Sequence, residues 1–166
     1  MPTVALINGH AFAGGLMIAM CHDYRIQNPS KGFLCLNEVY LGIPLQPPMT
    51  AIFRAKVPFG ITLRSLILEG RRFPSQEAVG VGLVDGLGGL DEVVQWVGER
   101  NLVAIAQSPS YQDLKTDLYR EILRLLDDHH GNEEWGQKMV ALNDKLVDEA
   151  QRKVEGFEKR TGKVKL

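Results

Sequence analysis

The chain has 166 residues, of which 45% are apolar, so it is long enough for one domain with a sizeable buried core. Its 19 basic and 20 acidic residues nearly cancel, which excludes a globally basic, nucleic-acid-binding protein. No apolar run approaches the roughly 18 residues that a membrane-spanning helix needs, and the two cysteines, Cys21 and Cys35, have no metal-binding spacing.

The N-terminal part predicts buried strands that alternate with a helix. Residues 3–7 form an apolar run typical of a strand inside a sheet, and an Asn-Gly turn signal follows it. Small residues then lead into the apolar run 16–23, which suits a buried helix, and residues 24–28 predict a second short strand. We predict a further extended segment over residues 32–42, which glycine and prolines close.

From residue 48 the apolar pattern changes to helical spacing. Residues 47–57 and 61–70 predict two helices, 74–89 a short helix followed by a strand, and 91–107 a longer helix. Two further helical stripes comprise Leu114, Leu118, Ile122, Leu125 and Leu126, and then Met139, Leu142, Leu146, Ala150, Val154 and Phe157. Strands with crossover helices, followed by helices, indicate an α/β chain, which we divide into residues 1–107 and 108–166.

The turn between the first strand and its helix is a candidate for binding an anion or a developing oxyanion. Small residues there, in the stretch NGHAFAGG, let other atoms approach the backbone closely. The first N–H groups of a helix have no partner within it and carry the positive end of its dipole. Tight packing of the turn on a neighbouring strand explains the same residues, so both interpretations stay open.

Glu38 lies within the apolar run FLCLNEVYLGIPL, where an unpaired carboxylate is costly to bury. A general base in an apolar pocket is the functional interpretation of this residue. The alternative is a carboxylate at the end of a strand that reaches solvent or a backbone N–H. Asn37 beside it could orient a polar group of a ligand or cap a turn.

The histidines do not predict a metal site. His10 lies in the small-residue turn and could face a ligand, yet no carboxylate or second histidine has ligand spacing to it. His22 is expected at a helix end, where a cation is favourable, and His129-His130 in a polar surface loop. We therefore expect no bound metal.

Three segments of the chain carry a resemblance to a known family. In order, PTVALINGHAFAGGLMIAMCHDYRI, LNEVYLGIPL and GRRFPSQEAVGVGLVD resemble the signature segments of the crotonase (enoyl-CoA hydratase/isomerase) superfamily, and within it those of Δ3,Δ2-enoyl-CoA isomerases. The resemblance covers the first half of the chain densely and the helical remainder loosely. It implies a crotonase-like ββα superhelix that lacks its N-terminal units, with a helical C-terminal trimerisation region.

The resemblance also implies roles for single residues. Gly14 takes the place of the glycine whose N–H holds the thioester oxyanion, and Ala13 stands where the family has a preceding glycine. Glu38 takes the place of a catalytic glutamate, and Asn37 is expected, with Gly14, along the bound thioester. Hydratases carry a second glutamate where this chain has Met17.

This single glutamate favours isomerisation over hydration. Hydration uses two carboxylates to hold and activate water, whereas one base can carry a proton from C2 to C4 of an acyl chain. We therefore expect a Δ3,Δ2-enoyl-CoA isomerase of fatty acid β-oxidation, with Glu38 as the proton shuttle, a fatty acyl-CoA substrate and no cofactor. The alternatives are an enoyl-CoA hydratase and a truncated, non-catalytic paralogue that joins mixed oligomers.

An assembly and a location follow from the same resemblance. The helical C-terminal region implies a homotrimer or a dimer of trimers, and its basic tail could meet CoA phosphates or simply be solvated. The final Lys-Val-Lys-Leu is similar to a peroxisomal import signal, and the mitochondrion is the alternative. Because the family's N-terminal section, with a second oxyanion N–H, is absent from this sequence, we expect either a site completed by another chain or a weakened site.

Overall fold

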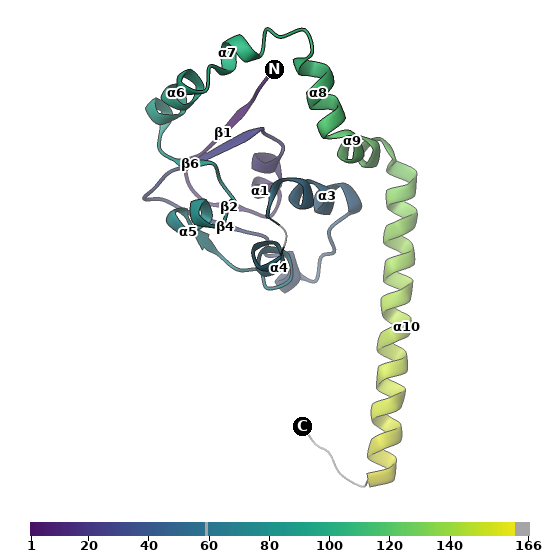
Figure 1. Ribbon diagram of the computed structural model, residues 1–166. Coiled ribbons are helices and arrows are strands. Elements are labelled where there is room, and N and C mark those ends of the chain that lie inside the picture. The colour runs from purple at the N-terminus through teal and green to yellow at the C-terminus, as the bar shows by residue number, and fades with distance from the viewer. Residues whose placement is uncertain (59, 162–166) are drawn as a thin grey trace. The chain divides into compact units, whose positions relative to one another are not determined.

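The computed structural model describes residues 1–58 and 60–161, and contacts divide the chain into two compact units, Met1–Leu126 and Asp127–Leu166 (Figure 1). The first unit is mixed α/β with two small sheets, and the second consists mainly of one long helix. Residues 108–126 therefore group with the first unit by their contacts. The division after residue 107 inferred from the sequence stays a prediction.

The first sheet is parallel and has the strand order β1-β3-β6. β1 (Val4–Ile7) pairs with β3 (Tyr24–Gln27), and β3 pairs with β6 (Gly86–Leu87). Parallel neighbours need a crossover connection, and helix α1 (Gly14–Met20) lies in the connection between β1 and β3. The strands predicted over residues 3–7 and 24–28 and the apolar helix between them are confirmed.

The second sheet joins three very short strands. β2 (Ala11–Phe12) is parallel to β4 (Phe33–Cys35), which is antiparallel to β5 (Phe73–Pro74). β2 leads directly into α1, and β4 leads into α2 (Glu38–Leu41). This sheet therefore brings the starts of two helices to the ends of two parallel strands.

The extended segment predicted over residues 32–42 is wrong beyond β4, because residues 38–41 form a helical turn. Gly42 ends this turn in the left-handed conformation, with φ 65°. The N–H of Ile43 then donates to the carbonyl oxygen of Glu38 at 3.1 Å. A glycine in this conformation satisfies the carbonyls at a helix end, which explains why the apolar run turns instead of continuing as a strand.

Helices α3 (Pro47–Lys56), α4 (Ile61–Ile67) and α5 (Ser75–Gly80) confirm the helices predicted in the middle of the chain. Their apolar faces pack together with α1 and both sheets into one core. The core residues with no exposed surface are Leu16, Met20, Leu34, Phe53, Leu66, Ala78 and Leu83.

The single helix predicted over residues 91–107 is wrong, because two helices, α6 (Leu90–Glu99) and α7 (Leu102–Ile105), occupy this range. Asn101 between them has φ 50°. Asparagine tolerates this left-handed conformation better than most residues, and it interrupts the helix there. Two short helices follow, α8 (Tyr111–Leu118) and α9 (Arg120–Asp127), and the first unit ends at Leu126 within α9.

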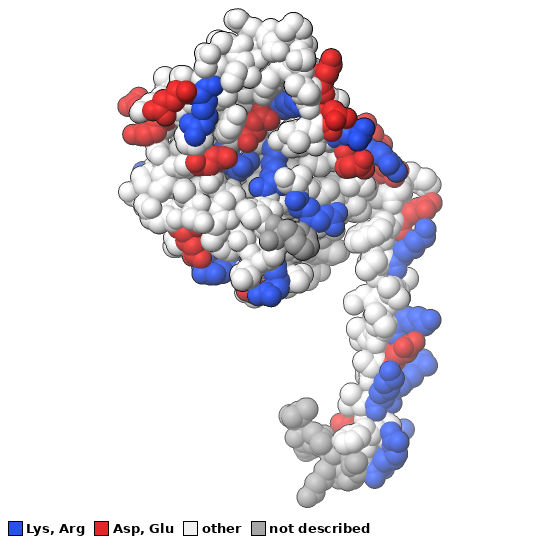
Figure 2. All heavy atoms as spheres, in the orientation of Figure 1, with Lys and Arg blue, Asp and Glu red and all other residues white. Residues whose placement is uncertain are grey.

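The loop predicted around His129-His130 is also wrong, because both residues begin α10 (His129–Thr161), a helix of 33 residues. Asp128 caps this helix: its Oδ1 atom accepts a hydrogen bond from the Gly131 N–H at 2.9 Å. Figure 2 shows Lys and Arg side chains spaced along the visible side of α10. Among the residues described, no helix combines the length and the apolar character needed to cross a bilayer.

A buried ion pair fastens β6 to β3. Arg25 is only 5% exposed, and its Nη2 atom lies 2.8 Å from Oδ2 of Asp85. Its Nε atom donates to the carbonyl oxygen of Leu83 at 3.0 Å, and its backbone N–H donates to the same Asp85 oxygen at 2.8 Å. A strand of two residues has few backbone hydrogen bonds to its neighbour. The contacts of Arg25 with Asp85 and Leu83 therefore help to hold β6 against β3.

We expect Arg25→Met to lower the free energy of unfolding by about 3 kcal/mol, because the carboxylate of Asp85 and the carbonyl of Leu83 lose their partner in a largely buried setting. Urea unfolding followed by circular dichroism measures the change. Arg120→Met is the matched control, since this arginine side chain is 70% exposed in its ion pairs and should change stability by less than about 1 kcal/mol. Equal losses in the two variants would contradict this role for Arg25.

Candidate functional site

The candidate site lies where the turn before α1 meets the end of β4. Ala13 has φ 48° and ψ −123°, and its N–H donates to the carbonyl oxygen of Cys35 at 2.9 Å. Its own carbonyl oxygen accepts the N–H groups of Leu16 and Met17 at 3.0 and 3.1 Å. One residue therefore ties the start of α1 to β4 and closes the first turn of the helix.

Gly14 begins α1, so its N–H belongs to the group at a helix start that has no partner within the helix. A Cβ atom built on Gly14 would meet no atom within 4 Å. The packing of this chain therefore does not require glycine at this position, and the space beside the backbone is open. The alternative interpretation, tight packing of the turn on β4, therefore applies to Ala13, whose N–H donates to Cys35, and not to Gly14.

Glu38 is the first residue of α2 and is only 8% exposed. Its Oε2 atom is buried without a hydrogen-bond partner, and so is the Oδ1 atom of Asn37 beside it. The alternative interpretation, in which the carboxylate reaches solvent or a backbone N–H, therefore does not apply to this oxygen. Buried polar atoms are nearly always hydrogen-bonded, so two neighbouring oxygens without partners are what a ligand or an ordered water would satisfy.

The parallel pairing of β2 and β4 brings these predicted site residues to one end of the second sheet. Phe12 lies opposite Cys35 in the register. Gly14 follows β2 by two residues, and Asn37 and Glu38 follow β4 by two and three residues. The turn that starts α1 and the turn that starts α2 therefore lie at the same strand ends, where polar groups of both can face one ligand.

Two further residues at this sheet were not singled out as site residues in the sequence. Burial raises the pKa of the Cys35 thiol, the charge of Arg72 lowers it, and the charge of Glu38 raises it further. The thiol also donates to the carbonyl oxygen of Gly70 at 3.2 Å, so Cys35 is a buried, protonated side chain of the core. The guanidinium of Arg72 lies 5.6 Å from the ring centre of Phe12 and places a positive charge near the site. Its only sequence signal is the pair of arginines before β5.

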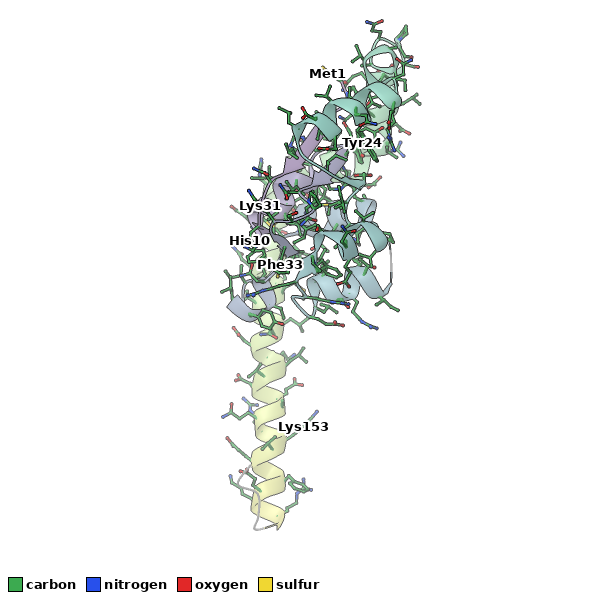
Figure 3. The ribbon with its side chains drawn as sticks, turned by 90° about the vertical axis from the view of Figure 1, so that its left-hand side faces the viewer. Met1, His10, Tyr24, Lys31, Phe33 and Lys153 are labelled. Atoms are coloured by element: carbon green, nitrogen blue, oxygen red, sulfur yellow. The ribbon has the colours of Figure 1, made fainter. Side chains whose placement is uncertain are left out.

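His10 holds the turn in place through contacts with β4. Its Nδ1 atom accepts the N–H of Phe33 at 3.2 Å, and the two rings stack with centres 5.7 Å apart. Both residues are labelled in Figure 3. Gly32 has φ 84°, and a Cβ atom there would clash with the carbonyl group of Gly9. The close approach of these two backbones therefore requires a glycine. Nowhere in the described part of the chain do three His, Cys, Asp or Glu side chains gather as a metal site would require.

A charged cluster at the other end of α1 ties the chain start to α8. Oδ2 of Asp23 accepts the N–H of Thr3 at 2.7 Å and lies 2.6 Å from Nζ of Lys115. Burial raises the pKa of Asp23, but the hydrogen bonds from Lys115 and Thr3 outweigh it and hold the pKa below its usual value. The Nζ atom of Lys56 donates to the carbonyl oxygen of His22 at 2.5 Å, and burial and the charge of Arg25 lower the pKa of Lys56 to about 8.

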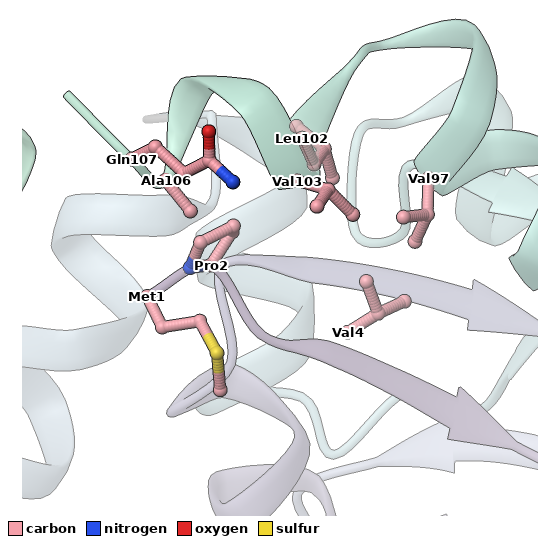
Figure 4. A pocket seen from close by; sticks show the side chains of 8 residues that line it. All are labelled: Met1, Pro2, Val4, Val97, Leu102, Val103, Ala106 and Gln107. Atoms are coloured by element: carbon pink, nitrogen blue, oxygen red, sulfur yellow. The ribbon is translucent and has the colours of Figure 1, made fainter.

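Two hollows flank β1. The first, with a volume of about 390 Å³, is lined by Met1, Pro2, Val4, Val97, Leu102, Val103, Ala106 and Gln107 (Figure 4). Its lining has no titratable side chain. The second, of about 410 Å³, follows residues 4–11 and includes Gly15 and His22 of the α1 side. This second hollow reaches the small-residue turn of the candidate site.

Comparison with known proteins places these features in a family. The family described as enoyl-CoA hydratase/isomerase matches residues 1–123 of the chain. The protein named enoyl-CoA delta isomerase 3 of Arabidopsis thaliana is 36% identical over 132 residues, which are 76% of this chain and 56% of that protein. The peroxisomal enoyl-CoA delta isomerase 2 of the same plant is 33% identical over 131 residues, 76% of this chain and 55% of that protein. The chain thus spans about half the length of these relatives.

Solved structures show the same fold. An enoyl-CoA hydratase of Mycobacterium ulcerans superimposes with a TM-score of 0.60 at 17% identity, and the match covers 72% of this chain and 52% of that one. At this identity the likeness concerns the fold alone. The two small sheets and their crossover helices are therefore part of a crotonase fold.

The low pKa of Lys56 predicts how stability changes with pH. Between about pH 8 and pH 10 the unfolded chain binds a proton on this side chain that the folded chain does not. The free energy of unfolding therefore increases as the pH rises through this range. Between about pH 7 and pH 9.5 we expect wild type to gain about 1 to 2 kcal/mol relative to Lys56→Met, measured by urea unfolding. Lys153→Met, in α10, is the control. A difference from Lys56→Met that is constant with pH would contradict the effect.

Proposed function

The chain belongs to the enoyl-CoA hydratase/isomerase family, and we propose that its reaction is the isomerisation of a 3-enoyl-CoA to the conjugated 2-enoyl-CoA. The substrate class is an unsaturated fatty acyl-CoA, and the step belongs to fatty acid β-oxidation. The observation that carries the proposal is Glu38, a carboxylate with a buried oxygen that has no protein partner. No cofactor beyond the CoA of the substrate enters the proposal.

Glu38 acts as the proton shuttle. Its carboxylate removes a proton from C2 of the acyl chain, and the electrons of that C–H bond delocalise over the double bond and the thioester carbonyl as a dienolate. The carboxylic acid then returns the same proton to C4, which places the double bond between C2 and C3. The short distance between C2 and C4 lets one base serve both carbons, provided that water is kept away.

Gly14 and Asn37 bind the thioester. The dienolate carries its negative charge largely on the thioester oxygen, and the N–H of Gly14, at the positive end of α1, donates to it. The open space beside Gly14 leaves room for that carbonyl. The unpartnered Oδ1 of Asn37 supports its place along the ligand, where it accepts a hydrogen bond from the substrate.

Met17 supports isomerisation rather than hydration. It lies in the first turn of α1, three residues after Gly14, and packs partly buried against the core. Adding water to an enoyl thioester takes a second carboxylate to hold the water, and an apolar thioether here cannot do this. One carboxylate in an apolar setting is sufficient for the proton transfer between C2 and C4.

The assembly and the location belong to the same proposal. We propose a homotrimer or a dimer of trimers built by the helical C-terminal region, as the resemblance implies. A peroxisomal location is supported by relatives whose names state it, and the mitochondrion is the alternative. The C-terminal Lys163–Leu166 tail, which suggested the peroxisome from the sequence, lies outside the described residues. The second candidate function is a non-catalytic partner in mixed oligomers, and the isomerase assay below distinguishes the two.

The proposal predicts that Glu38→Gln lowers the isomerisation rate by about 10² to 10⁴-fold, because the amide cannot accept the C2 proton. The assay follows the ultraviolet absorbance of the conjugated product formed from a 3-enoyl-CoA. Glu121→Gln is the matched control, since this side chain is 74% exposed and lies outside the site.

The control should retain the wild-type rate. A folded wild-type chain without isomerase turnover would reject the enzymatic proposal and favour the non-catalytic partner. Hydration of crotonyl-CoA at a rate above isomerisation would reject the isomerase in favour of the hydratase. Equal activity of wild type and Glu38→Gln would reject Glu38 as the base.

A further inference from the structure

The single helical turn that begins with Glu38 depends on contacts from elsewhere in the chain. α2 comprises only Glu38–Leu41, and the side chain of Asn37 before it makes no capping hydrogen bond. One helical turn is unstable in isolation, because fixing its backbone costs more free energy than its few hydrogen bonds return. A residue that fastens α2 to the rest of the chain therefore also fixes where the Glu38 carboxylate lies.

Tyr40 fastens α2 to the segment that precedes β5. Its hydroxyl group donates to the carbonyl oxygen of Glu69 at 2.6 Å. Its ring lies against the backbone of Gly70, where a Cβ atom would come within 2.5 Å of Cε2 of Tyr40 and 3.0 Å of Cγ1 of Val39. Gly70 also has φ 57°, a left-handed conformation that glycine adopts without strain. Both the conformation and the close approach of α2 therefore require glycine at this position.

The segment that receives Tyr40 is itself held on two sides. The thiol of Cys35 in β4 donates to the carbonyl oxygen of Gly70 at 3.2 Å. The N–H of Arg71 donates to the carbonyl oxygen of Ser65 in α4 at 3.1 Å. Tyr40 thus connects α2 to a segment that β4 and α4 already fix.

We propose that Tyr40 is a positioning residue, which holds Glu38 for the transfer of the proton between C2 and C4 of the substrate. Tyr40, Glu69 and Gly70 form a clamp on α2, and Tyr40 acts through α2 rather than on the substrate itself. The inference rests on the proposed function, because a clamp on α2 matters for catalysis only where Glu38 carries the proton.

The clamp matters most while the carboxylic acid of Glu38 holds the proton. Glu38 takes this proton from C2 and returns it to C4 of the same dienolate before water exchanges it. Small displacements of a reacting group from its productive geometry slow a reaction strongly. A loosened α2 therefore delays the return of the proton and gives the solvent more time to exchange it.

A purely structural role for Tyr40 predicts a different result. Lower stability reduces the fraction of folded molecules and hence the measured rate, but it does not alter what each folded molecule does with the proton. The origin of the hydrogen that arrives at C4 of the product therefore distinguishes positioning from stability.

The test is Tyr40→Phe, which removes the hydroxyl group and keeps the ring. Isomerisation of a 3-enoyl-CoA is run in deuterium oxide, and mass spectrometry of the earliest product gives the deuterium content at C4. We expect kcat to fall by about 3- to 10-fold, as the loss of one hydrogen bond allows, and KM to change by less than about twofold. The deuterium content at C4 should increase. Tyr24→Phe, in β3 of the first sheet, is the matched control and should keep the wild-type kcat and deuterium content.

The proposed function and the clamp fail in different ways. Wild-type turnover that Glu38→Gln abolishes would support the proposed function by itself. Equal kcat and equal deuterium content in wild type and Tyr40→Phe would then overturn the clamp and leave that function intact. A lower kcat with an unchanged deuterium content would assign Tyr40 a structural role only and would also overturn the clamp. Absence of wild-type turnover would reject the proposed function and, with it, the role of Tyr40 in the reaction.

Hydrogen exchange tests the clamp without the reaction. The N–H of Ile43 donates to the carbonyl oxygen of Glu38 at 3.1 Å and closes α2. We expect this amide to exchange about 3- to 10-fold faster in Tyr40→Phe than in wild type. The Asn28 amide, which donates to Ile7 in the first sheet at 2.9 Å, should keep its wild-type rate. Unchanged exchange at Ile43, or an equal increase at both amides, would overturn the clamp.

Discussion

The hydrogen bond from the N–H of Ala13 to the carbonyl oxygen of Cys35 is the contact on which the candidate site depends. It continues the parallel pairing of β2 with β4 one residue past Phe12 and stops where α1 begins. Because both strands are so short, this bond and the contact of Gly32 with Gly9 hold the turn against β4. Without that placement Gly14 and Glu38 would belong to two unrelated turns.

The site combines a rigid frame with polar atoms that the frame leaves unsatisfied. Hydrogen bonds and close backbone contacts hold Ala13, Gly32 and His10, while the buried side-chain oxygens of Asn37 and Glu38 have no protein partner. Buried oxygens of this kind cost free energy in the folded chain, and they persist at sites where a ligand completes the hydrogen bonding. The same logic distinguishes Asn37 and Glu38 from Cys35, whose thiol donates to Gly70 and is fully accommodated.

Ion pairs between residues that are far apart in sequence stabilise the first sheet, β1-β3-β6. Arg25 and Asp85 join β3 to the segment before β6, and Lys115 and Asp23, separated by 92 positions, join α8 to the end of α1. One pair holds β3 at Arg25 within the strand, and the other holds it at Asp23 just before the strand. Side-chain contacts therefore add to the short backbone ladders that hold the first sheet.

Sequence alone determined the order and type of most elements, because strands and helices have different apolar periods and because glycine, proline and asparagine mark their ends. It also determined the family, through three ordered motifs that the comparisons confirm. Local pattern failed at residues 38–41, at Asn101 and at His129, where a left-handed residue or a carboxylate cap decides between helix and loop. Only the tertiary structure brought Gly14 and Glu38 to the same strand ends, because strand pairing joins residues that no local pattern relates.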